Sequence, residues 1–415
     1  MSAMQVTVDA ERLGQELAHL ATYSDCKPPG VTRVLFTECD RRARGYLRRL
    51  CSDAGLKVRE DAIGNLFARW PGTHPELGAV GSGSHIDAIP HAGRYDGTVG
   101  VLGALEAMRA LRSAGFQPRR SIELLMFTSE EPTRFGVGCV GSRSLCGSLS
   151  ADDLCRLRDA DDHWFDHVRR EAGCHGELSS VRLPDGYYSA FVELHIEQGP
   201  RLEAAGVPIG VVTAIAAPAA LRVVIDGRGG HAGGVLMPDR RDALCTAAEA
   251  ILAVEAAARG SGSPDTVATT GGCRVYPNAV NSIPSRVVLE IDIRDVNRES
   301  RDRAVAAIRS AVAAIAQRRN CTAVVEILHS DPPAAMAPAV VAAIESACRM
   351  LQLNCQRMVS RAYHDSLFMA QRFPTGMIFI PCRRGVSHHP DEFAEPEAIR
   401  RGVEVLAQTL AELAT

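Results

Sequence analysis

The pattern of hydrophobic and polar positions predicts helices and strands that alternate through the first half of the chain. Apolar residues recur every three to four positions, as in helices that bury one face, over residues 38–54 and 98–111. Short apolar runs typical of buried strands occur at residues 78–83, 122–128 and 192–195, and two extended stretches flank Gly64-Asn65 within residues 57–70. This alternation favours an α/β layer structure.

The pattern changes between residues 214 and 330, where it predicts a βαββαβ unit. Its strands and helices are expected at residues 221–226, 241–258, 267–275, 287–293, 301–318 and 323–328. Asp331-Pro332-Pro333 is typical of a linker. The first pattern then resumes with a helix, a strand and a helix at residues 338–351, 377–381 and 397–413. We therefore expect a catalytic domain formed by residues 1–213 and 331–415, with a smaller α+β domain, residues 214–330, inserted into it.

Composition and charge narrow the class of protein. The chain has 415 residues, 46% of them hydrophobic, which is enough for a large core and two or three domains. Its 46 basic and 49 acidic residues are spread along the chain, so no basic field is available for nucleic acid or anionic lipid. A small substrate is expected, with no nucleic-acid or membrane partner.

The N-terminus and the cysteines predict the compartment. No charged segment leads into an apolar run at the N-terminus, and nowhere do eighteen apolar residues follow one another. The 13 cysteines are scattered without a C-x-x-C pair, which argues against a disulfide framework and a structural zinc site. A cytoplasmic protein with free thiols is the expectation.

The first candidate functional segment contains His85, Asp87 and Asp96 and comes just after a predicted strand. Two divalent ions about 3.5–4 Å apart need nitrogen and oxygen ligands and a carboxylate that bridges them. His85 and Asp96 supply two such ligands. Asp87 is close enough to accept the second imidazole N–H of His85 and fix its tautomer. By itself, a His-x-Asp motif is also compatible with ordinary polar residues at a strand end.

Further candidate ligands follow three other predicted strands. Glu130-Glu131 comes just after residues 122–128, so one carboxylate can bind metal while its neighbour acts as general base. His195 closes its strand, and His388 follows the strand at 377–381. Each alone is compatible with a solvated turn or a structural histidine. Together with His85 and Asp96 they favour a paired-metal hydrolase.

The inserted domain contributes residues that can bind a substrate. His231 lies in the glycine-bounded turn Gly229-Gly230-His231-Ala232-Gly233-Gly234 and could stabilise an oxyanion. Asn281 adds a side-chain amide, and Arg294 adds a guanidinium group that can bind a carboxylate with two hydrogen bonds. An ordinary surface salt bridge explains Arg294 equally well. The chain has neither G-x-G-x-x-G nor a Walker pattern, and no elbow motif surrounds Ser142 or Cys139. A nucleotide site and covalent catalysis are therefore disfavoured.

In their order, these motifs resemble the amidohydrolase branch of the dinuclear metallopeptidase superfamily, and the resemblance covers nearly the whole chain. It implies a mixed central sheet flanked by helices and an inserted lid domain that makes a homodimer and reaches into the partner's active site. It also implies two divalent metal ions per subunit, Mn²⁺ or Zn²⁺, with Glu130 as general base. The implied metal ligands are His85, Asp96 (bridging), Glu131, His195 and His388, and the implied substrate-binding residues are Gln198, His231, Asn281 and Arg294.

Three segments are similar to the ureidoglycolate amidohydrolases of this branch: residues 129–136, 231–238 and 361–370. Carbamoylases commonly show glycine where Arg361 and Tyr363 stand. Tyr363 and His364 are then expected to line the substrate pocket, with the tyrosine hydroxyl as a polar handle for a hydroxylated acid. Arg361 and Tyr363 could equally adapt the pocket of a carbamoylase to a substrate with another side chain.

The expected reaction is hydrolysis of the linear amide of a small ureido acid with release of ammonia. Ureidoglycolate is the first candidate, with a role in purine catabolism, and N-carbamoyl-L-amino acids and allantoate are the alternatives. A dimeric binding protein for a small acid, without catalysis, is the alternative of another class. Residues 152–185, with His163, His167 and His175, fit no motif and are expected to form a surface excursion.

Overall fold

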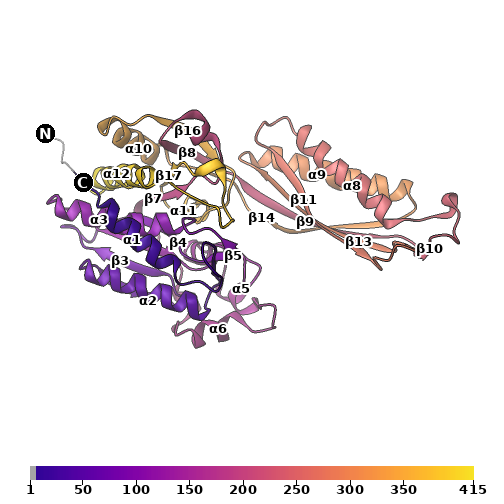
Figure 1. Ribbon diagram of the computed structural model, residues 1–415, viewed down its shortest axis with the longest axis horizontal. Helices are drawn as coiled ribbons and strands as arrows, with labels where there is room; N and C mark the ends of the chain where they lie inside the picture. Colours follow the sequence, from indigo (N-terminus) through magenta and orange to yellow (C-terminus); the bar gives the residue numbers. More distant parts are fainter. Residues whose placement is uncertain (1–5) are drawn as a thin grey trace. The chain divides into compact units, whose positions relative to one another are not determined.

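The computed structural model describes residues 6–415, which form two compact units (Figure 1). The first unit contains the chain up to Thr213 together with Ala335–Ser360 and His364–Thr415. The second contains Ala214–Ala334 and the short stretch Arg361–Tyr363. The chain therefore passes between the units at 213/214 and 334/335, and again on either side of 361–363. The sequence predicts the domain boundaries at 213/214 and 330/331.

A nine-stranded mixed sheet forms the centre of the first unit. In spatial order its strands are β15 (Ala334–Ala335), β8 (Ile209–Ile215), β17 (Thr375–Ile380), β7 (Tyr188–Ile196), β4 (Ala79–His85), β6 (Ile122–Phe127), β3 (Leu66–Trp70) and β2 (Lys57–Glu60), with β16 (Cys355–Ser360) paired to β8. The four central strands, β17, β7, β4 and β6, are parallel. Their outer neighbours β8 and β3 run antiparallel to them. This sheet, flanked by helices, confirms the predicted fold class.

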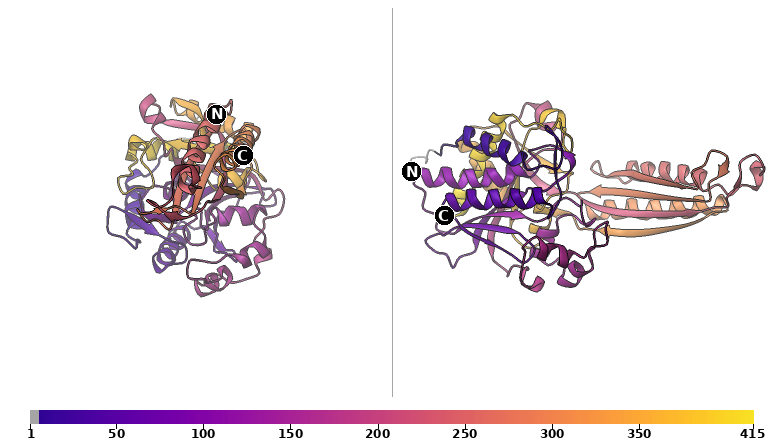
Figure 2. Two further views of the ribbon diagram at one scale, coloured as in Figure 1. Left: turned by 90° about the vertical axis from the view of Figure 1, so that its right-hand side faces the viewer. Right: turned by 60° about the horizontal axis from the view of Figure 1, so that its bottom comes forward.

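The central strands are buried on both faces, which explains why small or apolar residues fill most of their positions. Leu194 of β7 packs against Gly103 of α3 (Thr98–Ser113) and Gly402 of α12 (Pro396–Leu413). Phe191, an odd number of residues away, points to the other face and joins a core cluster with Phe127. On the first of these faces α1 packs beside α3 and α12, an arrangement visible in Figure 2.

The helices begin at the signals that the sequence offers. The side chain of Thr37 accepts the N–H of Asp40 at the start of α2, and Asn297 caps α9 in the same way. Pro338 and Pro396 occupy the first positions of α10 and α12. The long helices of this unit are α1 (Ala10–Ala21), α2 (Glu38–Asp53), α3 (Thr98–Ser113), α10 (Pro338–Met350) and α12 (Pro396–Leu413). None of the helices within residues 6–415 is both long and apolar enough to cross a membrane.

Several elements were not predicted from the sequence. They are α1, α4 (Val140–Cys146), α5 (Ala151–Arg156), α6 (Phe165–Glu171), α7 (Arg201–Ala205), α11 (Ser366–Met369), the strand pair β1 (Val31–Arg33) and β5 (Ala88–Ala92), and the strands β8, β15 and β16. Most are shorter than eight residues, and tertiary burial decides their conformation more than local pattern does.

The segment 152–185 is more than the expected surface excursion. Leu154, Phe165, Val168 and Val181 are buried in the cluster that contains Phe127 and Phe191, so this segment covers one face of the central sheet. Its histidines lie outside that core: His163 is near Asp159 and Asp161, and His167 pairs with Glu171 at 3.3 Å. The burial of large apolar side chains gives the segment a structural role.

The second unit has the predicted order of elements: β9 (Ala217–Asp226), α8 (Ala243–Arg259), β11 (Val267–Tyr276), β13 (Arg286–Asp295), α9 (Arg298–Arg318) and β14 (Thr322–Ser330). Its antiparallel sheet has the order β11-β13-β9-β14. Alternate residues such as Leu221, Val223 and Leu289 form a core with α8 and α9. Two short strands, β10 (Gly230–His231) and β12 (Ser282–Ile283), pair with each other.

Candidate metal centre

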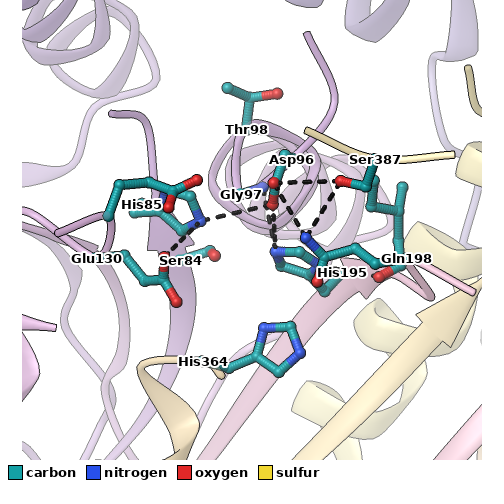
Figure 3. Close-up of polar contacts among 12 residues, drawn as sticks. Ser84, His85, Asp96, Gly97, Thr98, Glu130, His195, Gln198, His364 and Ser387 are labelled. Carbon is teal, nitrogen blue, oxygen red and sulfur yellow. Dashed lines mark hydrogen bonds and ion pairs between the residues drawn. The ribbon is translucent and has the colours of Figure 1, made fainter. Parts of the chain in front are cut away.

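The candidate ligands gather where the four central strands end. His85 is the last residue of β4, His195 lies one residue before the end of β7, and Glu130-Glu131 and His388 follow β6 and β17. Because these strands are parallel, their carboxyl ends share one edge of the sheet. Figure 3 shows Asp96, which precedes α3, between His85 and His195.

Two groups of three side chains share Asp96. The first group consists of His85, Asp96 and His195, and the second of Asp96, Glu131 and His388. Within each group, the ligand atoms lie within 4.8 Å of one another. Oδ1 of Asp96 lies 3.7 Å from Nε2 of His85 and 3.1 Å from Nε2 of His195. Oδ2 lies 3.1 Å from Nε2 of His388, which is 3.2 Å from Oε1 of Glu131. Each group therefore uses its own oxygen of Asp96.

These groups fit two divalent cations. Two ligand atoms at about 2.1 Å from a common ion, in tetrahedral geometry, lie about 3.4 Å apart, close to the separations within each group. The surroundings also favour cations, because Asp87, Asp96, Glu131 and Asp365 are buried around Glu130. A mixed set of imidazoles and carboxylates suits Zn²⁺ and Mn²⁺ alike.

The protonation of the cluster reflects this crowding. Burial opposes charge on Asp96, but hydrogen bonds with His195 and His388 outweigh it and hold the pKa of Asp96 well below its ordinary value. Hydrogen bonds with Asp96 and Glu131 raise the pKa of His388 to about 10. Burial works against a charge on His195, yet its hydrogen bond with Asp96 raises its pKa to about 9. In the absence of cations, protons on the two imidazoles balance the carboxylates.

Glu130 differs from Asp96 and Glu131 because it belongs to neither group of three. Its Oε2 lies 3.8 Å from Nε2 of His85, and the thiol of Cys139 donates to its Oε1 at 3.8 Å. Burial, then the negative charges of Glu131 and Asp365, raise the pKa of Glu130 well above its ordinary value. A carboxylate with such a pKa, beside the ligands but outside both groups, has the properties of a general base.

Backbone carbonyls, rather than side chains, orient the two strand-end histidines. Nδ1 of His85 bonds to the carbonyl oxygen of Asp87 at 3.0 Å, and Nδ1 of His195 bonds to that of Ile196 at 2.9 Å. The expectation that the carboxylate of Asp87 accepts from His85 is wrong: Oδ1 is 3.7 Å away. This carboxylate instead accepts the backbone N–H groups of Glu130 at 3.2 Å and Glu131 at 2.9 Å. Asp87 therefore fixes the loop that carries Glu130 and Glu131.

Gly97 is required for the close approach of Asp96 to His85. Its φ of 64° lies in the left-handed region, and a Cβ there would lie 2.4 Å from Nε2 of His85. Any larger residue would push the imidazole away from the shared carboxylate.

Three residues near the second group link its loops. The amide of Gln198 donates to Oδ2 of Asp96 at 3.0 Å and to Oγ of Ser387 at 3.2 Å. The buried carboxylate of Glu392 accepts the backbone N–H groups of Tyr95 and Asp96. The sequence indicated Gln198 by resemblance, but nothing in its local pattern indicated Glu392, which is close to Asp96 only in the folded chain.

His364 is placed differently from the expected pocket-lining position. It is 1% exposed, its ring packs against that of His195 with centroids 4.5 Å apart, and its Nε2 bonds to Ser360 at 3.0 Å. It also forms a group with Glu193 and His195. Its closest link to the centre is thus through the ring of His195.

The candidate residues of the second unit lie at two ends of its sheet. His231 pairs with Ser282, and the carbonyl of Asn281 accepts the N–H of Ala232 at 2.9 Å, so His231 and Asn281 are neighbours. They lie beyond the end of the sheet where Arg286 pairs with Asp226, whereas Arg294 pairs with Pro218 near the other end.

Arg294 and Tyr363 already have partners within the second unit. The Nε and Nη2 groups of Arg294 donate to Asp292 at 2.8 and 3.3 Å, and its Nη1 donates to the carbonyl of Arg361 at 3.1 Å. The hydroxyl of Tyr363 donates to Oδ2 of Asp331 at 2.6 Å. A substrate carboxylate bound by Arg294 would therefore compete with Asp292.

With this geometry in hand, similarity to known proteins identifies the family. Residues 81–412 match the profile of Peptidase family M20/M25/M40. The chain belongs to this family. It is 50% identical over 411 residues to "Ureidoglycolate hydrolase" of Oryza sativa subsp. japonica, covering 98% of this chain and 85% of the relative, and 39% identical to "N-carbamoyl-L-amino acid amidohydrolase" of Geobacillus stearothermophilus, covering 98% and 99%.

A solved structure of another relative supports the same placement. The crystal structure of AtUAH in complex with glyoxylate is 50% identical to this chain and covers 99% of it, with 98% of that chain aligned and a TM-score of 0.90. A second crystal structure, of AtUAH in complex with (S)-hydroxyglycine, is 49% identical, with the same coverage and TM-score. Membership of the M20 family confirms the expected resemblance, the fold class and the assignment as a hydrolase of carbon–nitrogen bonds in linear amides.

Proposed function

We propose that this M20 enzyme hydrolyses ureidoglycolate with release of ammonia, a step of purine catabolism. The observation that carries the proposal is 50% identity, over nearly the whole chain, to relatives from Oryza sativa and Arabidopsis thaliana that are named ureidoglycolate hydrolase. The ligand of one similar structure, (S)-hydroxyglycine, is what remains of ureidoglycolate when its carbamoyl group is removed. Attack of water at the ureido carbonyl accounts for this product, because the carbamoyl nitrogen then leaves as ammonia and the carbamoyl carbon as carbon dioxide.

Two divalent ions, Mn²⁺ or Zn²⁺, would be held by the two groups that share Asp96. His85 and His195 would complete one site, and Glu131 and His388 the other. When bound, such ions supply a nucleophile at neutral pH and polarise the carbonyl under attack.

Glu130 takes the proton of the attacking water on its carboxylate and passes it to the leaving amine. The high pKa of Glu130 in the cation-free protein shows how strongly this buried position retains a proton. Asp87 holds the backbone of Glu130 and Glu131 through two hydrogen bonds, so the base and a ligand keep a fixed separation.

The carboxylate of the substrate would be bound by Arg294, with release of part of its bond to Asp292. His231 would stabilise the oxyanion, and Asn281 beside it would bind the substrate through its amide. Gln198 and Tyr363 would contact polar groups of the ureido acid. His364 would act mainly through the ring of His195, against which it packs.

The placement of these residues supports a homodimer. Eight residues of β13 separate Arg286 from Arg294, about 26 Å at about 3.3 Å per residue, and His231 lies beyond the Arg286 end. A ureido acid is far smaller than this distance. One small substrate can therefore meet both residues only if His231 and Arg294 come from different subunits, as a lid that reaches into the partner's site provides.

The runner-up function is hydrolysis of an N-carbamoyl-L-amino acid, because relatives with that name are up to 39% identical over the whole chain. A binding protein without catalysis is disfavoured, since Glu130 and all five candidate ligands are present and gathered.

Removal and return of metal tests the proposal. Dialysis against a chelator should abolish ammonia release from ureidoglycolate, and Mn²⁺ or Zn²⁺, added separately, should restore it. Activity that persists after the cation content, measured by mass spectrometry, has fallen below one tenth of an ion per subunit would overturn the metal-dependent function.

A further inference from the structure

Glu392 joins two loops that lie almost three hundred residues apart in sequence. Its side chain is buried, with 4% of the residue exposed. Oε1 accepts the backbone N–H of Tyr95 at 2.8 Å and that of Asp96 at 3.1 Å, while Oε2 accepts the hydroxyl of Ser387 at 2.8 Å. One carboxylate therefore fixes the backbone of Asp96 and the residue beside His388.

The two loops are packed as closely as the side chain allows. A Cβ at Gly93 would lie 2.3 Å from Cβ of Glu392, so the loop before Asp96 passes directly over this side chain. Ser387 continues the connection, because its hydroxyl lies 3.4 Å from Oδ2 of Asp96, the oxygen that faces His388. Backbone and side chain of Asp96 are thus both tied to the loop of His388.

The five candidate ligands differ in how firmly the fold holds them. His85 and His195 belong to central strands and are 2% and 1% exposed, and Asp87 holds the backbone of Glu131. The side chain of His388 is 46% exposed and follows β17 on an irregular loop, with a φ of 56°. Of the five, His388 depends most on contacts made by its own loop.

We propose that Glu392 is a positioning residue that fixes the separation of Asp96 and His388 and thereby sets the cation affinity of the group Asp96, Glu131 and His388. The group His85, Asp96 and His195 depends on Glu392 less, because its two histidines are held by the sheet. The inference rests on the proposed metal centre. Partners that orient ligands in this way typically contribute about 10–100-fold to metal affinity.

Cation binding to the purified full chain tests the inference without reference to catalysis. Glu392→Ala should bind one ion per subunit with nearly wild-type affinity and the second 10-fold to 100-fold more weakly, as measured by calorimetric titration with Zn²⁺ and by metal content after dialysis. Glu392→Gln should lose less than Glu392→Ala, since its amide oxygen can still accept both backbone N–H groups and its NH₂ can donate to Ser387.

Two further variants keep the test decisive. Asp391→Ala removes the neighbouring carboxylate, whose side chain is 80% exposed, and should bind both ions like the wild type. Ser387→Ala removes the hydrogen bond to Glu392 together with the contacts to Gln198 and Asp96, and it should weaken the second ion several-fold even if Glu392→Ala does not fold. The role of Glu392 is overturned if Glu392→Ala binds both ions with wild-type affinity. If Glu392→Ala is unfolded, wild-type affinity for both ions in Ser387→Ala overturns it instead. A wild-type chain that binds no ions would instead overturn the proposed metal centre.

Discussion

His231 and Arg294 lie toward opposite ends of one antiparallel sheet, separated by about 26 Å of β13 and a further turn. If both act on one substrate, each active site contains residues of two subunits. His231→Ala and Arg294→Ala should each be nearly inactive alone. After the two are unfolded and refolded together in equal amounts, half of the dimers are mixed and each mixed dimer has one intact site.

The mixture should therefore recover about a quarter of the wild-type activity per subunit. The two variants refolded separately and then combined serve as the control. No recovery, despite dimers shown by light scattering, would mean that the two residues do not meet at a shared site.

Glu130→Gln should separate cation binding from turnover. The amide keeps the shape of the side chain but cannot take a proton, so kcat should fall by about 10²–10⁴-fold. Both ions should remain, since Glu130 belongs to neither ligand group. Metal content and ammonia release, measured on the same preparation, check this. A variant with near-normal kcat would remove Glu130 from the role of base.

Cation affinity should rise with pH. In the cation-free protein His388 has a pKa of about 10 and His195 of about 9, so both carry protons at pH 7. A metal ion binds neutral imidazole and must therefore displace these protons. Without a metal ion, the imidazoles lose them only as the pH rises through the two pKa values. The apparent association constant should increase at least tenfold per pH unit between pH 6 and 8. Calorimetry in buffers of different ionisation enthalpy should detect the released protons, and a pH-independent constant would contradict the assigned ligands.

The segment 152–185 should contribute to stability rather than to the metal centre. Phe165 is fully buried against Phe36 and Phe135, so Phe165→Ala should lower the free energy of unfolding by about 3–5 kcal/mol. The neighbouring Trp164 is 43% exposed, and Trp164→Ala should have a much smaller effect. Denaturant unfolding measures both. Equal effects would show that Phe165 does not belong to the core.

The sequence predicted elements best where local pattern and burial agree. The fully buried strands β6 and β17 are mostly apolar, the buried strand β4 consists mainly of small residues, and the helices α2, α10 and α12 begin at capping residues or prolines. The strand β16 is largely exposed or half-buried and has no such pattern, so only its pairing with β8 makes it a strand.

The same limit applied to the site. His85, Glu131, His195 and His388 could be recognised because each lies at or after the end of a strand, although their meeting depends on strand order. Glu392 could not be recognised, since its role depends on hydrogen bonds to residues 296 and 297 positions away. The bond from Arg294 to the carbonyl of Arg361 and the partners of the Asp87 carboxylate were likewise decided by tertiary packing, which offers a side chain more partners than spacing reveals.

The choice of substrate is the central claim, and a comparison of kcat/KM tests it most directly. The enzyme loaded with Mn²⁺ should be assayed for ammonia release from ureidoglycolate, allantoate, N-carbamoyl-L-amino acids and 3-ureidopropionate under the same conditions. We expect ureidoglycolate to exceed every other substrate by at least 100-fold in kcat/KM. A higher kcat/KM for any carbamoyl amino acid or for allantoate would contradict the proposed function.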